Sequence, residues 1–510
     1  MTGLRGRVPL LPAFLVVGTA LWGQNLKQFE KQVTEFTLSN GLHFIVVERH
    51  DVPAVSFRTW VDAGSVNDPA GATGLARLFE RVAYKGTDTI GTSDWASEKK
   101  ALDAVEEANA LVEAERNKGP RADQTHLSML DMQLQSALNQ AQSFAQPYEY
   151  AAIIQSNGGV GPTAGVTYDH TEFRCDLPSN RIELWFAMES QRLQSPVFRE
   201  FYKERDAAVE EQHTRVESNP QALLLQDLLA TAFQASPIHN PPMGWPGDMQ
   251  NLRMSDGRGF FEKYYVPSNI IISLVGDVNP DEVRRLAERY FGSLPARPAP
   301  AVPHSQETAQ RGPRSIQLDW SAPPLLACGY KRPDQRDPDD PVFRIMAHIL
   351  SGGHMSVLYK DLVQDQRIAQ DVQAIPAYPN GRFPSLFAFL VVPSREHTVE
   401  ENQKALDALI AHLQTDKVDD ESLNRARSKA RAAWIAQLDS NQGLASLLPM
   451  YYAAYGDWRK LFTTLGDLDK VTAEDIQRVA RKYLVPAQRT VAFIAAPPPR
   501  PAPVVRGGRQ

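Results

Sequence analysis

Three charged residues within Gly71–Thr87 have a spacing that could place them around one reaction centre. The segment reads GATGLARLFERVAYKGT and contains Arg77, Glu80 and Arg81. On a helix, residues i and i+4 share a face, and residue i+3 lies beside them. Two histidines at positions 77 and 81, with a glutamate between them, could hold a zinc ion whose bound water the glutamate would activate. This chain has arginine at both positions.

Arginine cannot replace histidine as a zinc ligand, because its guanidinium stays protonated and has no lone pair to donate. No other histidine pair takes over, since none of the 11 histidines has a second histidine at i+4. His170 and His213 could approach the region, although we expect His213 to face away and His170 to be an ordinary strand residue. A metal site rebuilt from such residues remains an alternative.

The elements that must position these residues are predicted to form two similar halves. KYYVPSNIIISLVG begins at Lys263, and KYLVPAQRTVAFIA begins at Lys482. In each run a helix is expected to end at the proline and a buried strand to follow. We therefore predict an α+β fold with two homologous α/β domains that arose from a tandem duplication.

Composition suggests the boundaries of these domains. The N-terminal domain is expected at residues 30–293 and the C-terminal domain at 314–495. A Pro-rich polar linker is predicted at 294–313, and the similar tail 496–510 is predicted to be disordered. Apolar residues at helical spacing on both sides of Gly119-Pro120 predict a helical-hairpin insertion at 94–146, which we interpret as a structural arm.

The N-terminus predicts export. Residues 1–23 carry two arginines ahead of an apolar run that is short for a bilayer span, as in a cleaved signal peptide. A retained membrane anchor is the alternative. We see no other apolar run of spanning length, so the mature protein is expected to be periplasmic or secreted without a stable membrane span.

The bulk composition excludes some classes of function and of structure. The chain has 510 residues, 43% hydrophobic and 22% charged residues, and a formal net charge of −6, so a nucleic-acid partner is not expected. The 2 cysteines, Cys175 and Cys328, are too few for a disulfide scaffold, and the sequence leaves open whether they pair.

The segment GLARLFERVAYKGT resembles the motif helix of the pitrilysin/insulinase family of zinc metallopeptidases, with arginine in place of both histidines. Further segments resemble that family in the same order. Residues 157–173 resemble the strand that pairs with substrate, 201–211 the helix with the third zinc ligand, and YYVPSNIIISLVGDV the end of the first domain. Residues 352–369 resemble the corresponding helix of the second domain. The resemblance implies two metallopeptidase-like domains, as in subunits similar to those of the mitochondrial processing peptidase.

The resemblance also assigns positions in the metal centre. Glu80 falls at the catalytic base, and Arg77 and Arg81 fall at the two histidine ligands. Glu211 falls at the third ligand, and Glu204 falls at the carboxylate that supports it. These positions are vestigial if no metal binds.

Two other parts of the family's active centre also differ. Thr163 stands where an asparagine is usual in the substrate strand, followed by the expected Ala164. Val363 and Gln370 stand where the family has an arginine and a tyrosine that hold the substrate. We expect Thr163 and Ala164 to contact substrate if peptide is bound.

Electrostatics predict how the site is rearranged. Without a dication, the carboxylates around Glu80, Glu204 and Glu211 would repel one another. Two guanidiniums would restore the positive charge and can bind carboxylates in bidentate fashion. We therefore expect Arg77 and Arg81 to form salt bridges with Glu211 and its neighbours. The alternative is that both arginines point to solvent.

Three functions remain open at this point. The first is a non-catalytic homologue that forms a heterodimer with an intact relative and shapes its chamber. The second is a stand-alone peptide-binding or scaffold protein that captures extended peptides by strand addition. The third is a peptidase with an unconventional metal site. For the first two we expect no cofactor, although the resemblance implies zinc in active relatives.

Overall fold

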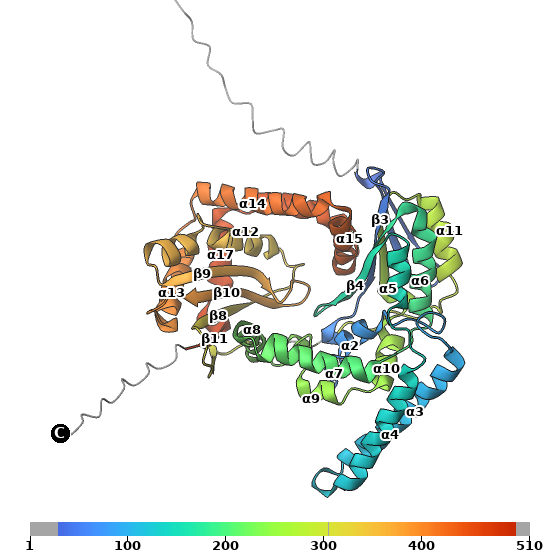
Figure 1. Cartoon of the computed structure of the whole chain (residues 1–510). Coiled ribbons are helices and arrows are strands. Elements are labelled where there is room, and N and C mark those ends of the chain that lie inside the picture. Colours follow the sequence, from blue (N-terminus) through green and yellow to red (C-terminus); the bar gives the residue numbers. More distant parts are fainter. Residues whose placement is uncertain (1–28, 304, 306, 496–510) are drawn as a thin grey trace, which may run out of the picture.

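The computed structural model describes residues 29–303, 305 and 307–495. The predicted signal peptide (1–23) and the predicted disordered tail (496–510) lie outside these described residues. Two α/β halves face each other, and the part of the linker described between residues 294 and 313 contains no helix or strand (Figure 1).

The first half is built on a six-stranded sheet with the order β1-β2-β6-β3-β5-β4. Its strands are β1 (Val33–Thr37), β2 (His43–Glu48), β3 (Ala54–Val61), β4 (Val160–Val166), β5 (Thr171–Pro178) and β6 (Ile270–Gly276). Only β2 and β6 pair in parallel; the other neighbours are antiparallel.

The second half is built on a five-stranded sheet with the order β7-β11-β8-β10-β9. Its strands are β7 (Arg314–Leu318), β8 (Leu325–Arg332), β9 (Ala369–Tyr378), β10 (Ser385–Pro393) and β11 (Arg489–Ile494). The order and the single parallel pair, β7 with β11, repeat those of the first sheet once β1 is set aside. The predicted fold of two homologous domains is confirmed.

Helices cover both sheets. The first half contributes α2 (Leu75–Val82), α3 (Trp95–Arg116), α4 (Gln124–Gln142), α5 (Glu149–Ser156), α6 (Ile182–Gln194), α7 (Phe201–Gln212), α8 (Pro220–Ala232), α9 (Pro246–Gln250), α10 (Met254–Tyr264) and α11 (Pro280–Phe291). The second half contributes α12 (Asp340–Ser351), α13 (Val399–Thr415), α14 (Asp420–Asp439), α15 (Asn441–Tyr455), α16 (Lys460–Lys470) and α17 (Ala473–Tyr483). The two K-Y-x-V-P runs mark the ends of α10 and α17, as predicted.

The two halves exchange one helix each. Helix α8 of the first half packs on β7, β8 and β11 of the second, and α15 of the second half packs on β3 and β6 of the first (Figure 1). Leu228 of α8 and Leu448 of α15 are both fully buried in these contacts. Each sheet therefore needs the other half of the chain to cover one of its faces.

The strand sequences fit burial on both faces. In β2, Phe44 and Val46 belong to the core under the first half's own helices, whereas Ile45 and Val47 belong to the cluster that α15 covers. Because side chains of a strand alternate between faces, a run with every residue apolar can fill two cores. The exchange of helices explains why HFIVV lacks polar alternation.

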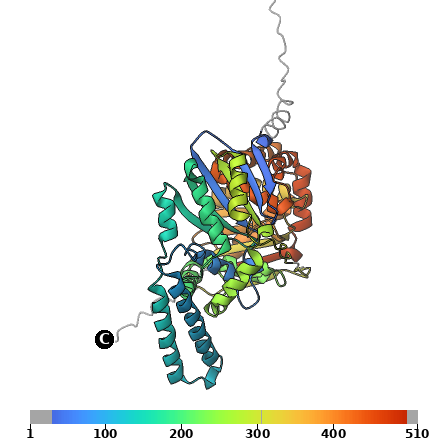
Figure 2. The same ribbon diagram turned by 90° about the vertical axis from the view of Figure 1, so that its right-hand side faces the viewer.

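Helices α3 and α4 form the predicted hairpin and project from the first half (Figures 1 and 2). Val112 of α3 and Leu130 of α4 are buried on the hairpin and lie outside the main core of the first half. Arg116 of α3 and Asp131 of α4 form an ion pair of 3.0 Å across the hairpin. The arm therefore has its own small apolar seam.

Two open points about the chain can be stated from the structure. Cys175 in β5 and Cys328 in β8 are free and buried in different sheets, so they do not pair. Across the part of the chain that the structure describes, no helix is long and apolar enough to cross a membrane.

Candidate functional site

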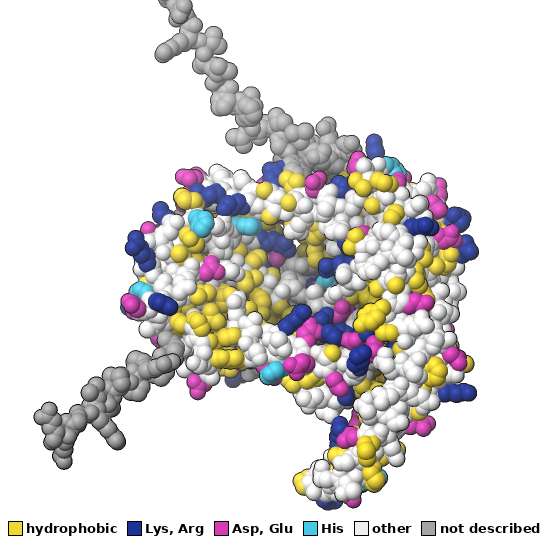
Figure 3. All heavy atoms as spheres, in the orientation of Figure 1, with side chains coloured by type: hydrophobic (Ala, Val, Ile, Leu, Met, Phe, Trp, Pro, Cys, Tyr) yellow, Lys and Arg dark blue, Asp and Glu magenta, His cyan; other side chains and the backbone are white. Residues whose placement is uncertain are grey.

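The site lies beside the hollow between the halves, where charged side chains gather over α2 and α7 (Figure 3). Helix α2 starts at a glycine cap, Gly74, whose φ of 88° favours glycine and whose Cβ position would approach Met243 O to 2.9 Å. Asp68 accepts hydrogen bonds from the backbone N–H groups of Gly74 at 2.8 Å and Ala76 at 2.9 Å. These contacts fix the first turn of α2 and hence the direction of its side chains.

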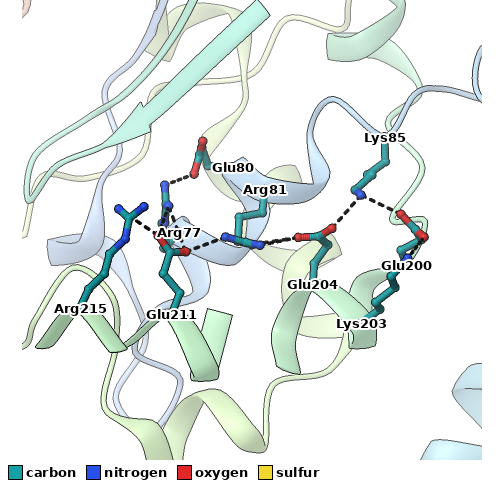
Figure 4. A network of polar contacts seen from close by, with 9 residues as sticks. All are labelled: Arg77, Glu80, Arg81, Lys85, Glu200, Lys203, Glu204, Glu211 and Arg215. Carbon is teal, nitrogen blue, oxygen red and sulfur yellow. Dashed lines mark hydrogen bonds and ion pairs between the residues drawn. The ribbon is translucent and has the colours of Figure 1, made fainter. Parts of the chain in front are cut away.

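Helix α2 turns Arg77 and Arg81 toward α7, which packs against it, and Glu80 lies beside Arg77 on the side away from α7 (Figure 4). Phe79 and Leu78 point the other way and are buried in the core of the first half. Helix α7 presents Glu204 and Glu211 to α2 (Figure 4). All five residues assigned to the metal centre are thus brought together by the packing of two helices.

Arg81 binds two carboxylates of α7. Its Nε and Nη2 donate to Oε2 of Glu204 at 2.9 Å and 2.8 Å, and its Nη1 donates to Oε2 of Glu211 at 2.6 Å. Arg77 donates to Glu80 within α2, and its Nη2 lies 3.3 Å from Oε1 of Glu211. The expected salt bridges between the arginines and Glu211 with its neighbours are confirmed, and the solvent-facing alternative is wrong.

The network extends beyond the residues that the sequence singled out. Lys85 Nζ lies 2.7 Å from Oε1 of Glu204 and 2.7 Å from Oε2 of Glu200. Lys203 also binds Glu200 at 2.7 Å, and Arg215 binds Oε1 of Glu211 at 3.0 Å. The charges alternate from Arg215 to Lys203 along one continuous chain of ion pairs (Figure 4).

Burial makes these pairs stronger than surface ion pairs. The side chains of Glu80, Glu204 and Glu211 are 10%, 14% and 13% exposed, and those of Arg77 and Arg81 are 22% and 23% exposed. A charge at such depth loses much of its hydration, so removing one partner leaves the other poorly solvated. We infer that the network is a cooperative structural unit.

Three pKa values report this environment. Burial raises the pKa of Glu80 above its ordinary value, although Arg77 and Arg81 oppose the shift. Burial opposes the charge on Lys85, but its hydrogen bonds to Glu200 and Glu204 outweigh that effect and raise the pKa of the ammonium. Burial likewise disfavours the Glu200 carboxylate, yet the bonds from Lys203 and Lys85 lower its pKa overall.

The donor set does not fit zinc. At two of the three positions that the resemblance assigns to zinc ligands, this chain has protonated guanidiniums, which have no lone pair for a metal. Within residues 29–303, 305 and 307–495, no group of three or more His, Cys, Asp or Glu side chains is placed to hold a metal ion. The residues present therefore neutralise the carboxylates of the site with Arg and Lys side chains.

The expected substrate residues lie on β4, the edge strand of the first sheet, against which α2 packs. Thr163 is exposed, and its carbonyl accepts a hydrogen bond of 3.2 Å from the hydroxyl of Tyr84. Ala164 is partly buried against the core of the first half. The edge of β4 that faces away from β5 has no strand partner among the described residues.

The other positions singled out from the sequence do not join the network. Val363 packs against the core of the second half, and Gln370 is exposed on β9. His170 stacks on Trp60 with ring centroids 3.5 Å apart, and His213 is 60% exposed beside Glu217. Neither histidine could rebuild the metal site, so that alternative has no support in the geometry.

Sequence reasoning missed Lys85, Glu200, Lys203 and Arg215. Arg77, Arg81 and Lys85 are spaced four residues apart, which continues one basic stripe from the end of α2. Glu211 and Arg215 are also four apart. These spacings were the available signal, but which helix faces meet depends on packing that the sequence pattern does not reveal.

Two family models match this chain. The model described as "Insulinase (Peptidase family M16)" matches residues 135–244, and the one described as "Peptidase M16 inactive domain" matches residues 253–430. Together they span more than half of the sequence. The chain belongs to the insulinase (M16) peptidase family. The insulinase match begins after α2, so the matched residues do not include the arginine-containing motif.

Curated relatives share sequence similarity over most of this chain. The zinc protease PqqE of Helicobacter pylori is 27% identical over 362 residues, which cover 68% of this chain and 78% of that protein. The probable mitochondrial-processing peptidase subunit beta of Arabidopsis thaliana is 22% identical over 464 residues, covering 89% of this chain and 76% of the relative. The names of these relatives refer to zinc proteases or to peptidase subunits.

Solved M16 structures share the fold. A protease from Helicobacter pylori superimposes with a TM-score of 0.75 at 22% identity, covering 91% of this chain and 99% of that chain. The periplasmic protease PqqL from Escherichia coli has a TM-score of 0.66 at 15% identity. That match covers 92% of this chain but 48% of PqqL, so this chain corresponds to about half of it.

Proposed function

We propose that this protein is a non-catalytic M16 homologue that acts as the partner subunit of an intact relative in peptide proteolysis. The observation that carries the proposal is the pair of arginines at the two histidine positions, both in ion pairs with Glu211. Guanidiniums satisfy the carboxylates electrostatically but supply no Lewis acid to polarise a peptide carbonyl.

The state of Glu80 supports the same proposal. In a metal-dependent peptidase of this type the glutamate acts on a metal-bound water. Here the carboxylate of Glu80 accepts from Arg77 and is 10% exposed. A general base needs a free lone pair within hydrogen-bond reach of its proton donor, and this ion pair competes for that lone pair.

A role as a partner subunit is motivated by the relatives. Several of them are named as subunits of mitochondrial-processing peptidase, both beta and alpha. A chain of that type without its own metal site would contribute chamber walls and peptide contacts rather than chemistry. In this proposal the hollow between the halves (Figure 3) faces the chamber of the intact subunit.

The edge strand favours a second candidate, a stand-alone peptide-binding protein. Strand β4 has an open edge beside the network, and an extended peptide could add to it by backbone hydrogen bonds. This candidate requires no partner. The two candidates differ in whether the chain binds peptide alone or acts only within a complex.

Export is part of the proposal. The N-terminal apolar segment predicts a secretory signal. One structural relative, PqqL, is described as a periplasmic protease. We propose that the protein works in the periplasm or outside the cell, where it would meet unfolded peptides.

The test is a cleavage assay on an unstructured fluorogenic peptide. The purified chain is assayed alone, then mixed with its nearest relative that has an intact H-x-x-E-H motif. We expect no cleavage by the chain alone and a change in the kcat/KM of the relative upon mixing, together with a complex in light scattering. Chelator-sensitive cleavage by the chain alone that Glu80→Gln abolishes would overturn the proposal. Peptide binding without any complex would favour the stand-alone candidate.

A further inference from the structure

The network at α2 and α7 carries more positive than negative groups. Figure 4 labels nine charged residues, of which five are Lys or Arg and four are Glu. The excess is not spread evenly along the chain of ion pairs. At the Lys85 end, Glu200 and Glu204 each bind two cationic side chains.

At the other end of the network, one carboxylate forms ion pairs with three guanidiniums. Glu211 binds Arg81 at 2.6 Å, Arg215 at 3.0 Å and Arg77 at 3.3 Å. A carboxylate offers about four acceptor positions, whereas each guanidinium has about five N–H donors. The donors of the three arginines therefore outnumber the acceptor positions that Glu211 and Glu80 provide there.

Arg215 has the most donor capacity left. Among the described residues Glu211 is the one carboxylate that it contacts, and its side chain is 69% exposed. It follows α7 in the short helical segment His213–Glu217 and reaches Glu211 from the side opposite Arg81 (Figure 4). Arg77 also reaches Glu211 and remains 22% exposed.

The position of these donors relative to β4 suggests what they bind. Helix α2, which carries Arg77, packs against β4, and the outer edge of β4 is open. A peptide added to this edge would pass the end of the network at which positive charge is in excess. Guanidiniums bind carboxylates with charge-assisted, often bidentate hydrogen bonds.

We propose that Arg77 and Arg215 form a carboxylate-binding site that captures the C-terminal carboxylate of an extended peptide. The proposal rests on the peptide-binding part of the proposed function and names the class of ligand. An Asp or Glu side chain of the peptide is the other source of the same chemistry. In either case the arginines hold a peptide in place where the relatives named zinc proteases would carry metal.

The experiment compares three acetylated, fluorescently labelled nonapeptides by anisotropy. The first is uncharged apart from a free C-terminal carboxylate, the second has the same sequence with a C-terminal amide, and the third is the amide with one internal Glu. The full chain is used, alone and in complex with the intact relative. We expect the free carboxylate to bind at least about tenfold more tightly than the amide, a difference typical of one charge-assisted contact.

Variants test the residues. Arg215→Gln should remove most of the preference for the carboxylate, and because the side chain is exposed the substitution should leave the fold intact. Arg77→Gln should do the same if circular dichroism shows that it is folded. Arg289→Gln is the matched control, because Arg289 is 62% exposed, pairs with a single glutamate and lies on α11. It should keep the preference.

Each result decides one point. Equal binding of the free acid and the amide overturns the carboxylate site but leaves peptide binding intact. Preference for the internal Glu over the C-terminus retains the site and rejects the C-terminal assignment. Preference for the carboxylate that survives in Arg215→Gln and in folded Arg77→Gln overturns the assignment to these arginines. If no peptide binds either the chain or the complex, the proposed function itself fails.

Discussion

Nη1 of Arg81 lies 2.6 Å from Oε2 of Glu211, and the two residues occupy positions that resemble two zinc-ligand positions of the M16 family. The contact joins α2 to α7, as a shared metal would. A guanidinium here holds the two helices together without supplying a Lewis acid. Under the proposed function, the fold is kept because these ion pairs take over the structural part of the metal's role.

Restoring histidines should restore metal binding. The variant Arg77→His/Arg81→His is expected to bind about one zinc ion per chain, because both side chains and Glu211 converge from two packed helices. Zinc is measured by elemental analysis after dialysis. The control is Arg77→Gln/Arg81→Gln, which removes the same charges without adding ligands. Equal zinc contents in the two double variants would show that the helices do not present these positions to one point.

Removing Glu211 should destabilise the protein. In Glu211→Gln three guanidiniums lose their shared carboxylate, and we expect the free energy of unfolding to fall by about 1–3 kcal/mol, between the values for exposed and for fully buried pairs. Urea denaturation measures the change. Glu210→Gln on the same helix is exposed and should change stability by less than about 0.5 kcal/mol. A loss as small in Glu211→Gln as in the control would contradict a cooperative network.

Glu307 should make the junction of the halves sensitive to acid. Its carboxylate accepts from the backbone N–H groups of Gln234, Ala235 and Ser236 and from Lys331 at 2.9 Å. Burial opposes its charge, but Lys331 and these N–H groups hold the pKa of Glu307 down to about 2 from 4.5. Since the folded pKa is depressed, its contribution is present above pH 4.5 and is lost as the pH falls toward about 2.

Glu307→Gln should therefore lower the free energy of unfolding near pH 7 by about 1–2 kcal/mol. Between pH 4.5 and 3, the free energy of unfolding should fall less in the variant than in the wild type. Urea denaturation at a series of pH values measures both effects. Glu421→Gln, at a side chain 86% exposed, is the control. Identical pH profiles for wild type and Glu307→Gln would contradict the assigned role.

The exchanged helices should couple the stability of the two halves. Leu448→Ala on α15 removes a fully buried side chain and should cost about 2–5 kcal/mol. Because α15 covers the first sheet, amide exchange should accelerate in β3 and β6 although the change lies in the second half. Leu111→Ala, at a residue 54% exposed on the arm, is the control. Faster exchange confined to the second half would contradict the coupling.

Local signals in the sequence predicted much of this structure. The prolines at positions 267 and 486 predicted the two helix-to-strand transitions, and the repeated pattern around them predicted two homologous domains. The break at Gly119-Pro120 predicted the hairpin. The spacing of Arg77, Glu80 and Arg81 predicted one charged face on α2. Each of these features depends on residues close together in the chain.

The remaining features depend on contacts between distant segments. The exchange of α8 and α15 leaves no periodic signal, since a helix has the same apolar stripe whichever sheet it covers. Lys85 was within the motif that was recognised, yet its partners Glu200 and Glu204 become apparent only when α2 and α7 are packed. The place of Arg215 in the network, through its ion pair with Glu211, likewise becomes apparent only from this packing.

The zinc content of the purified wild-type chain tests the central claim most directly. The protein is expressed with zinc in the medium, dialysed against metal-free buffer and measured by elemental analysis, with an intact M16 relative treated identically. Because guanidiniums stand at two of the three positions that the resemblance assigns to zinc ligands, we predict far less than one zinc per chain, while the relative retains about one. One tightly held zinc per wild-type chain that is absent from the Glu211→Gln variant would contradict the replacement of the metal by arginine.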